Sequence, residues 1–99
     1  MFTVVETPEF QKQASKVWSE AERMDFIVWL AENPEAGEVV PGASGARKVR
    51  WQVQGRGKRG GVRVIYLNFT QDEFVMLLAI YAKNERENMA AHEIGRKVK

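Results

Sequence analysis

The chain has 99 residues, 44% of them hydrophobic, which predicts one globular domain spanning residues 1–99. It contains no cysteine, which excludes a disulfide scaffold, a thiol nucleophile and a thiolate-bound metal. The first residues lack the basic and apolar regions of a signal peptide, and no apolar stretch reaches the ~20 residues of a membrane-spanning helix. We therefore expect a cytoplasmic protein with no membrane partner.

The charges are distributed unevenly along the chain. The formal net charge is only +2, but residues 1–38 carry −5 and residues 39–71 carry +7, with no aspartate or glutamate in the second segment. Seven cations without a counter-charge repel one another, and a polyanion bound among them would offset that cost. Nucleic acid is the leading candidate for this partner. The alternative is a basic surface that only aids solubility.

The first third of the sequence predicts a strand and two helices. Residues 2–6 are β-branched and apolar, as in a strand. Thr7 is placed to cap a helix whose first position is Pro8. The apolar stripe of this helix consists of Phe10, Ala14, Val17 and Trp18. Residues 19–22 (SEAE) form a capping box, so a second helix follows at once and makes an antiparallel hairpin with the first.

The middle of the sequence predicts three strands. Residues 34–45, rich in proline and glycine, are expected to form a loop. From Ala46 the pattern alternates between an apolar face and a cationic face that contains Lys48 and Arg50. After a glycine-rich turn at 55–61, residues 62–69 and 74–83 are apolar at almost every position. We expect these two segments to be central strands joined by a hairpin.

The last helix is predicted to begin at Asn84, a capping residue followed by Glu85. Its apolar stripe is faint and consists of Ala90, Ile94 and Val98. The whole order, βααβββα, predicts an α+β fold with a mostly antiparallel sheet, an N-terminal helix hairpin and a C-terminal helix.

The common catalytic sets are absent from the sequence. The single histidine, His92, lies in the weakly patterned last helix and is expected to be exposed, so neither a histidine pair nor a metal-ligand cluster is available. The glycines of residues 55–61 lie between two strands and open no helix, unlike the glycines of nucleotide-binding motifs. We expect no metal and no cofactor.

Cations in strands remain as candidates for chemistry. Arg63 begins an apolar strand, where a guanidinium must find a partner or open onto a cleft. Lys83 ends the next strand and projects from the same face as Tyr81. A pocket of arginine, lysine and tyrosine suits phosphodiester chemistry, and RNA brings its own nucleophile, the 2′-hydroxyl. The alternative is that Arg63 and Lys83 merely pair with nearby carboxylates.

Three segments carry a resemblance to a known family: residues 45–51 (GARKVRW), 57–66 (GKRGGVRVIY) and 80–88 (IYAKNEREN). Together they resemble the RelE/ParE superfamily of bacterial toxins, most closely its HigB/RelE-like branch. The resemblance implies the toxin of a type II toxin–antitoxin module, a metal-independent endoribonuclease that cleaves mRNA on translating ribosomes and so inhibits translation. It also implies three partners: a cognate antitoxin of the helix-turn-helix type, the ribosome and mRNA.

The resemblance assigns roles to individual residues. It matches Arg63, which would support the transition state, and Lys83; with Tyr81, which the strand pattern places beside them, these are the candidate catalytic residues. The candidate RNA- and ribosome-binding residues are Arg47, Lys48, Arg50, Arg56, Lys58 and Arg59. The chain departs from the RelE pattern at two positions, since Asn84 stands where that branch has a catalytic arginine and Ala90 falls near a functional tyrosine.

Two questions stay open at this point. The general base is not identified, and Tyr66, Tyr81 and Arg86 are the candidates for this role. Other functions are also compatible with the sequence: a non-catalytic poison of DNA gyrase, like the ParE branch of the same fold, or a plain RNA-binding domain.

Overall fold

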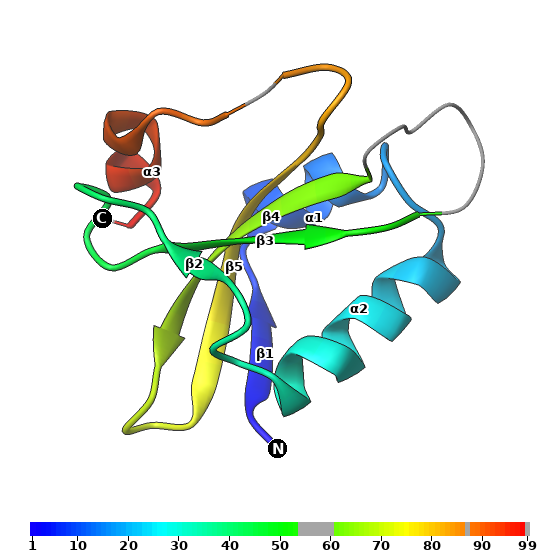
Figure 1. Cartoon of the computed structure of the whole chain (residues 1–99). Coiled ribbons are helices and arrows are strands. Elements are labelled where there is room, and N and C mark those ends of the chain that lie inside the picture. The colour runs from blue at the N-terminus through cyan, green and yellow to red at the C-terminus, as the bar shows by residue number, and fades with distance from the viewer. Residues whose placement is uncertain (54–60, 87, 99) are drawn as a thin grey trace.

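The computed structural model describes residues 1–53, 61–86 and 88–98, which form three helices and a five-stranded sheet (Figure 1). The elements are β1 (Thr3–Glu6), α1 (Pro8–Ala14), α2 (Glu20–Glu32), β2 (Glu38–Val39), β3 (Arg47–Trp51), β4 (Val62–Phe69), β5 (Phe74–Ala82) and α3 (Ala91–Val98). The strand order is β1-β5-β4-β3-β2. Only β1 pairs in parallel, with β5, so the described sheet is mostly antiparallel, as predicted.

The predicted starts of the first two helices are confirmed. The Thr7 hydroxyl accepts a hydrogen bond from the Phe10 backbone N–H, and Ser19 and Glu22 form the reciprocal capping box. The first helix is shorter than its apolar stripe predicts, because α1 ends at Ala14. Ser19 must adopt extended backbone angles to cap α2, so residues 15–18 are needed for the turn between the helices.

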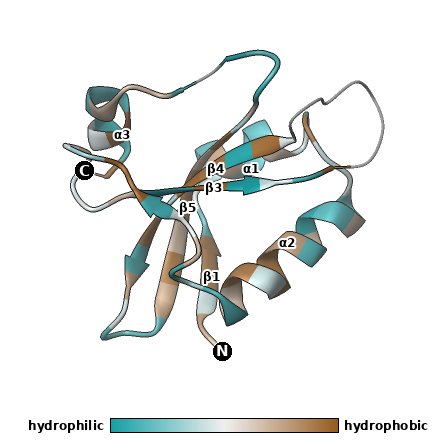
Figure 2. Ribbon diagram, viewed as in Figure 1, coloured by the Kyte–Doolittle hydropathy of each residue, from teal (hydrophilic) through white to brown (hydrophobic). Residues whose placement is uncertain are grey.

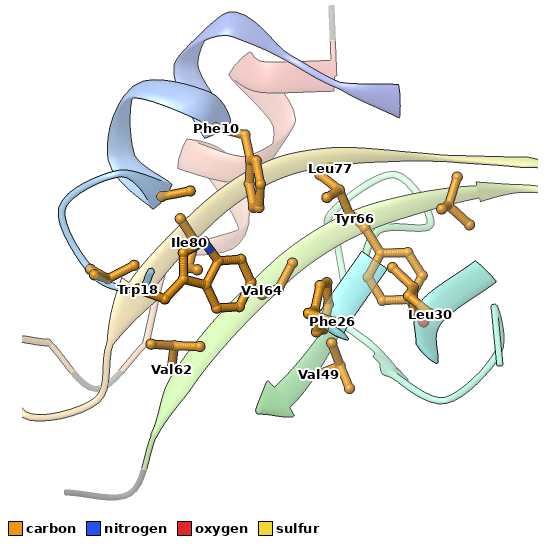
Figure 3. Close-up of a cluster of buried hydrophobic side chains, with 13 residues drawn as sticks. Phe10, Trp18, Phe26, Leu30, Val49, Val62, Val64, Tyr66, Leu77 and Ile80 are labelled. Carbon is orange, nitrogen blue, oxygen red and sulfur yellow. The ribbon is translucent and has the colours of Figure 1, made fainter. Parts of the chain in front are cut away.

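One core lies between the sheet and the two helices α1 and α2 (Figure 3). Trp18, in the turn between these helices, contacts Phe10 at a ring-centroid distance of 6.3 Å and Phe26 at 5.3 Å. Phe26 in turn meets Trp51 of β3 at 5.3 Å. This continuous row of aromatic rings fixes both helices on the same face of the sheet.

A second core lies on the opposite face of the sheet, beneath α3. Ile94 of α3 and Met89, which precedes the helix, pack there against the sheet residues Ile65 and Leu78. Figure 2 shows that β5, which contributes to both cores, is largely hydrophobic, whereas the stretch directly after β5 is hydrophilic. None of the described helices is long and apolar enough to cross a membrane.

Two predicted boundaries need correction. The expected loop at 34–45 contains the short strand β2, which pairs with Arg47 and Lys48, so the observed order is βααββββα. The last helix begins at Ala91, not after Asn84. The Glu93 carboxylate accepts a hydrogen bond from the Ala90 backbone N–H, and Asn84 lies in a turn that follows β5. His92 is exposed on α3, as expected.

Candidate nucleic-acid cleft

A row of paired residues crosses the centre of the sheet on the face that carries α3. Arg50 of β3 lies opposite Arg63 of β4, and Arg63 lies opposite Tyr81 of β5. Lys48, two residues before Arg50, belongs to the same face and lies opposite Glu38 of β2. Because side chains of directly opposed residues project to the same side of a sheet, strand pairing alone brings these groups together.

This face is hollowed into a cleft of about 450 Å³, which we call the cationic cleft. It is lined by Ala36, Glu38, Lys48, Val49, Arg50, Arg63, Lys83 and Asn88. Arg63 and Lys83 therefore open onto the same space, although Arg63 belongs to β4 and Lys83 directly follows β5. Four of the lining residues carry a positive charge and one, Glu38, carries a negative charge.

Among the described residues, Arg63 is the one buried cation, with 6% of its surface exposed. One of its guanidinium nitrogens lies 3.4 Å from the Val62 carbonyl oxygen. The neighbouring residues Ile65 and Ala79 are fully buried on the same face. The strand thus holds the arginine between the apolar core under α3 and the cleft, in surroundings where water screens its charge less than at the surface.

Lys83 is placed by a contact between the two ends of the central strands. Its backbone N–H donates a hydrogen bond to the carbonyl oxygen of Gly61, at 3.2 Å. Gly61 has a φ of +70°, and a Cβ atom there would lie 2.2 Å from the carbonyl oxygen of Trp51. Only glycine fits this position, so the glycine-rich turn predicted from the sequence has a structural role at its last residue.

Asn88 links two sides of the cationic cleft. Its side-chain oxygen accepts a hydrogen bond from the Lys48 ammonium group at 2.7 Å, although the two residues are 40 positions apart. Sequence reasoning missed both Asn88 and Glu38 as members of the site. Glu38 had a usable signal: Val39 and Val40 precede a turn sequence, PGASG, and a strand, which is the pattern of a hairpin.

Arg47 lies on the other face of β3 and does not line the cleft. Its guanidinium donates to the Gly37 carbonyl oxygen at 2.8 Å. Tyr66, opposite Arg47, donates its hydroxyl hydrogen to the Pro34 carbonyl oxygen and accepts from the Gly37 backbone N–H, both at 2.9 Å. Burial raises the pKa of Tyr66. Both residues thus hold the segment that leads into β2, away from Arg63.

Tyr81 is a neighbour of Arg63 but lines a second pocket, of about 260 Å³, on the other side of the β5 end. Its hydroxyl is buried and has no hydrogen-bond partner within the described ranges. Burial raises the pKa of Tyr81, and this shift is opposed by the Met89 backbone N–H, which lies near the hydroxyl without hydrogen-bond geometry, and by the charges of Arg86 and Arg63. The remaining candidate cations, Arg56, Lys58 and Arg59, lie outside the described residues.

No protein-family model matches this chain. Among solved structures, a mutant of the E. coli toxin RelE in the free state has a TM-score of 0.64 at 16% sequence identity, covering 98% of this chain and 96% of that one. The isolated E. coli RelE toxin has a TM-score of 0.61 at 16% identity, covering 99% of this chain and 98% of that one. The intact E. coli RelBE toxin–antitoxin complex has a TM-score of 0.57 at 16% identity, covering 81% of this chain and 94% of that one.

These likenesses define the class of the fold. The chain is an α+β protein whose elements match those of a small bacterial toxin over nearly its full length. More particularly, it has the RelE-like fold, as the sequence resemblance implied.

Proposed function

We propose that this chain is the toxin of a type II toxin–antitoxin pair and that it cleaves mRNA bound to the ribosome. The observation that carries the proposal is the cationic cleft, in which Arg50 and Arg63 lie directly opposite each other beside Lys48 and Lys83. Like charges placed opposite each other on a sheet cost free energy. A phosphodiester bound in the cleft would attract both arginines and so offset their repulsion. The RelE-like fold supports the choice of RNA.

The proposed reaction is an internal transfer at phosphorus. The 2′-oxygen of the substrate forms a bond to phosphorus, and the bond from phosphorus to the 5′-oxygen of the next nucleotide breaks. The products are a 2′,3′-cyclic phosphate and a free 5′-hydroxyl. Arg63 binds the non-bridging oxygens, where negative charge develops in the transition state. Lys83 gives a proton to the departing 5′-oxygen.

The same reaction requires a group that accepts the proton of the 2′-hydroxyl. We assign this role to Glu38, the one carboxylate among the described residues that line the cleft. The three candidates from the sequence fit poorly. The Tyr66 hydroxyl is already bonded on the far face of the sheet, Tyr81 does not line the cleft, and an arginine such as Arg86 stays protonated in proteins. Glu38 and Lys83 would then serve as base and acid on opposite sides of Arg63.

The remaining candidates keep supporting roles in the proposal. Lys48 and Arg50 would bind the phosphates that flank the cleaved bond, and the basic residues of the 55–61 segment would extend this contact along the RNA. Tyr81 would act through its ring, as the cross-strand neighbour that supports Arg63, because its hydroxyl does not open onto the cleft.

The test is to incubate translating ribosomes with the purified protein and to map mRNA ends. We expect cuts that leave 2′,3′-cyclic phosphates. Arg63→Ala should slow cleavage by about 10²- to 10³-fold, the usual cost of removing one group that stabilises an oxyanion. Glu38→Gln and Lys83→Ala should each slow it by at least tenfold. Lys12→Ala, which removes an exposed lysine of α1, is the matched control and should cleave normally.

Each contrary result points elsewhere. Full cleavage by an Arg63→Ala, Lys83→Ala double variant would remove the assignment of the site. A DNA-damage response without mRNA cuts would indicate a gyrase poison instead. Binding of RNA without toxicity or cuts would reduce the protein to an RNA-binding domain. The proposed antitoxin is tested separately, by co-purification with the product of a neighbouring reading frame, for which a small helix-turn-helix protein is expected.

A further inference from the structure

Arg86 is tied to three parts of the molecule at once. It lies in the segment between β5 and α3, with the centre of its guanidinium 5.4 Å from the centroid of the Tyr81 ring. One terminal nitrogen donates to the Glu93 carboxylate of α3 at 2.8 Å. The Nε–H group donates to the backbone carbonyl of Asn88 at 3.2 Å. A single side chain therefore fixes the Asn88 backbone relative to both β5 and α3.

Asn88 passes this constraint on to the cationic cleft. Its side chain accepts the hydrogen bond from the Lys48 ammonium, and both residues line the cleft. Lysine side chains have many rotamers and lose them at a cost when they bind a ligand. A lysine that is held by a fixed acceptor before the substrate arrives has already lost part of that freedom. The position of Lys48 thus depends on Asn88, and the position of Asn88 depends on Arg86.

The chemistry of Arg86 excludes a direct role as base and favours this structural one. Its guanidinium stays charged and forms an ion pair with Glu93, and this hydrogen bond is the main reason that the pKa of Glu93 is lowered. Arg86 lines the second pocket, beside Tyr81, and not the cleft that holds Arg63. It can influence the cleft through its contacts with Asn88 and Tyr81.

We infer that Arg86 is a positioning residue, which acts through Asn88 to hold the Lys48 ammonium in place for the substrate phosphate. The inference rests on the proposed function for its effect on cleavage, but its structural part can be tested alone. Arg86→Ala should lower the single-turnover cleavage rate by about 10- to 100-fold, since small displacements in a site cost this much. Ribosome affinity should change by less than about threefold, because the charge of Lys48 remains.

A double-mutant cycle with Asn88→Ala separates positioning from loss of stability. If Arg86 acts through the side chain of Asn88, then adding Arg86→Ala to an Asn88→Ala protein should slow cleavage by no more than about twofold. Arg86→Lys keeps the charge beside Glu93 but lacks the planar guanidinium, whose separate nitrogens reach Glu93 and Asn88, so it should recover only part of the lost rate. Arg96→Ala removes an exposed arginine of α3 and is the control, with normal cleavage expected.

The contrary result is an equal loss from Arg86→Ala in both backgrounds, which would overturn the inference. Hydrogen exchange of the Lys48 ammonium, followed by NMR, supplies the readout that needs no activity. We expect slow exchange in the wild-type protein and faster exchange in Arg86→Ala and Asn88→Ala. Unchanged exchange in Arg86→Ala would also overturn it. Should the wild-type protein not cleave mRNA, the proposed function fails, and the exchange measurement alone decides the role of Arg86.

Discussion

Neighbouring cations of β3 have different surroundings, because successive side chains of a strand face opposite sides of the sheet. Arg47 is half-buried and bonded to backbone carbonyls on the face that carries α1 and α2. Lys48 and Arg50 face the cationic cleft. The count of positive charges in a sequence segment therefore overstates the number that one ligand can contact.

The first prediction follows from this division. Replacing Lys48 or Arg50 by glutamine should reduce the slope of log affinity against log salt by about 0.7 for a single-stranded RNA, the value for one lost phosphate contact. Arg47→Gln should leave the slope unchanged and lower the free energy of unfolding by about 1 kcal/mol, because two backbone carbonyls lose a donor. Fluorescence anisotropy with a labelled RNA, at salt concentrations from about 50 to about 200 mM, measures the slopes. Equal slopes for all three variants would contradict the assignment of faces.

The two buried tyrosines of the sheet should respond in opposite ways to loss of the hydroxyl. Tyr66→Phe leaves the Gly37 backbone N–H without its acceptor and should cost about 1–3 kcal/mol of stability. Tyr81→Phe removes a buried hydroxyl that has no partner among the described residues, so stability should stay constant or rise. Cleavage by Tyr81→Phe should remain within about threefold of wild type, since the ring is retained. Chemical unfolding measures the stability of Tyr66→Phe and of Tyr81→Phe. A loss of cleavage rate of tenfold or more in Tyr81→Phe would mean that the hydroxyl takes part in the mechanism.

The raised pKa values of these tyrosines also predict how stability depends on pH. Burial raises the pKa of Tyr66 and of Tyr81, so the folded protein keeps both protons at a pH where the unfolded chain releases them. Their contribution to stability is fully present below the unfolded pKa of about 10 and is lost as the pH rises from there through the raised values. Urea unfolding at a series of alkaline pH values should show this decline. The decline should be smaller in Tyr81→Phe, and an identical pH profile would contradict the buried state of the hydroxyl.

At the scale of elements, local chemistry predicted most of the boundaries. Both of these N-caps depend on residues within three positions of each other, and the strands β4 and β5 are apolar at almost every position, so their signals are complete in the sequence. The misplaced elements depend on distant contacts. The two residues of β2 become a strand only because β3 pairs with them, and α3 forms where Ile94 reaches the core beneath the sheet.

The turn between β3 and β4 gives a prediction at this scale. Gly61→Ala should lower stability by more than about 2 kcal/mol, because the added methyl group would collide with the Trp51 carbonyl in addition to the strain of a positive φ. Gly45→Ala is the control, since its φ is +87° but nothing lies within 4 Å of the added atom, and its cost should be about 1 kcal/mol. Gly61→Ala should also slow cleavage, through the lost hydrogen bond that places Lys83. Equal costs for the two variants in thermal unfolding would show that the collision is relieved by a backbone shift.

At the scale of the whole molecule, the cleft is assembled from four separate parts of the chain. Glu38 comes from β2, Lys48 and Arg50 from β3, Arg63 from β4, and Lys83 and Asn88 from the chain that follows β5. The sequence could indicate Arg63 and Lys83, because they are polar residues at the ends of apolar strands. It could not indicate Asn88, which is an ordinary polar residue until the fold places it opposite Lys48.

The two cores of the sheet should therefore differ in their effect on function. Ile94 of α3 packs against the sheet face that carries the cleft, and Leu30 of α2 packs against the opposite face. Both residues are fully buried. Ile94→Ala and Leu30→Ala should each lower stability by about 2–5 kcal/mol. At a temperature where both variants remain folded, Ile94→Ala should slow cleavage, because α3 holds Arg86 through Glu93, while Leu30→Ala should cleave normally. Equal rate losses at matched stability would mean that the cleft depends on the stability of the whole domain and not on the position of α3.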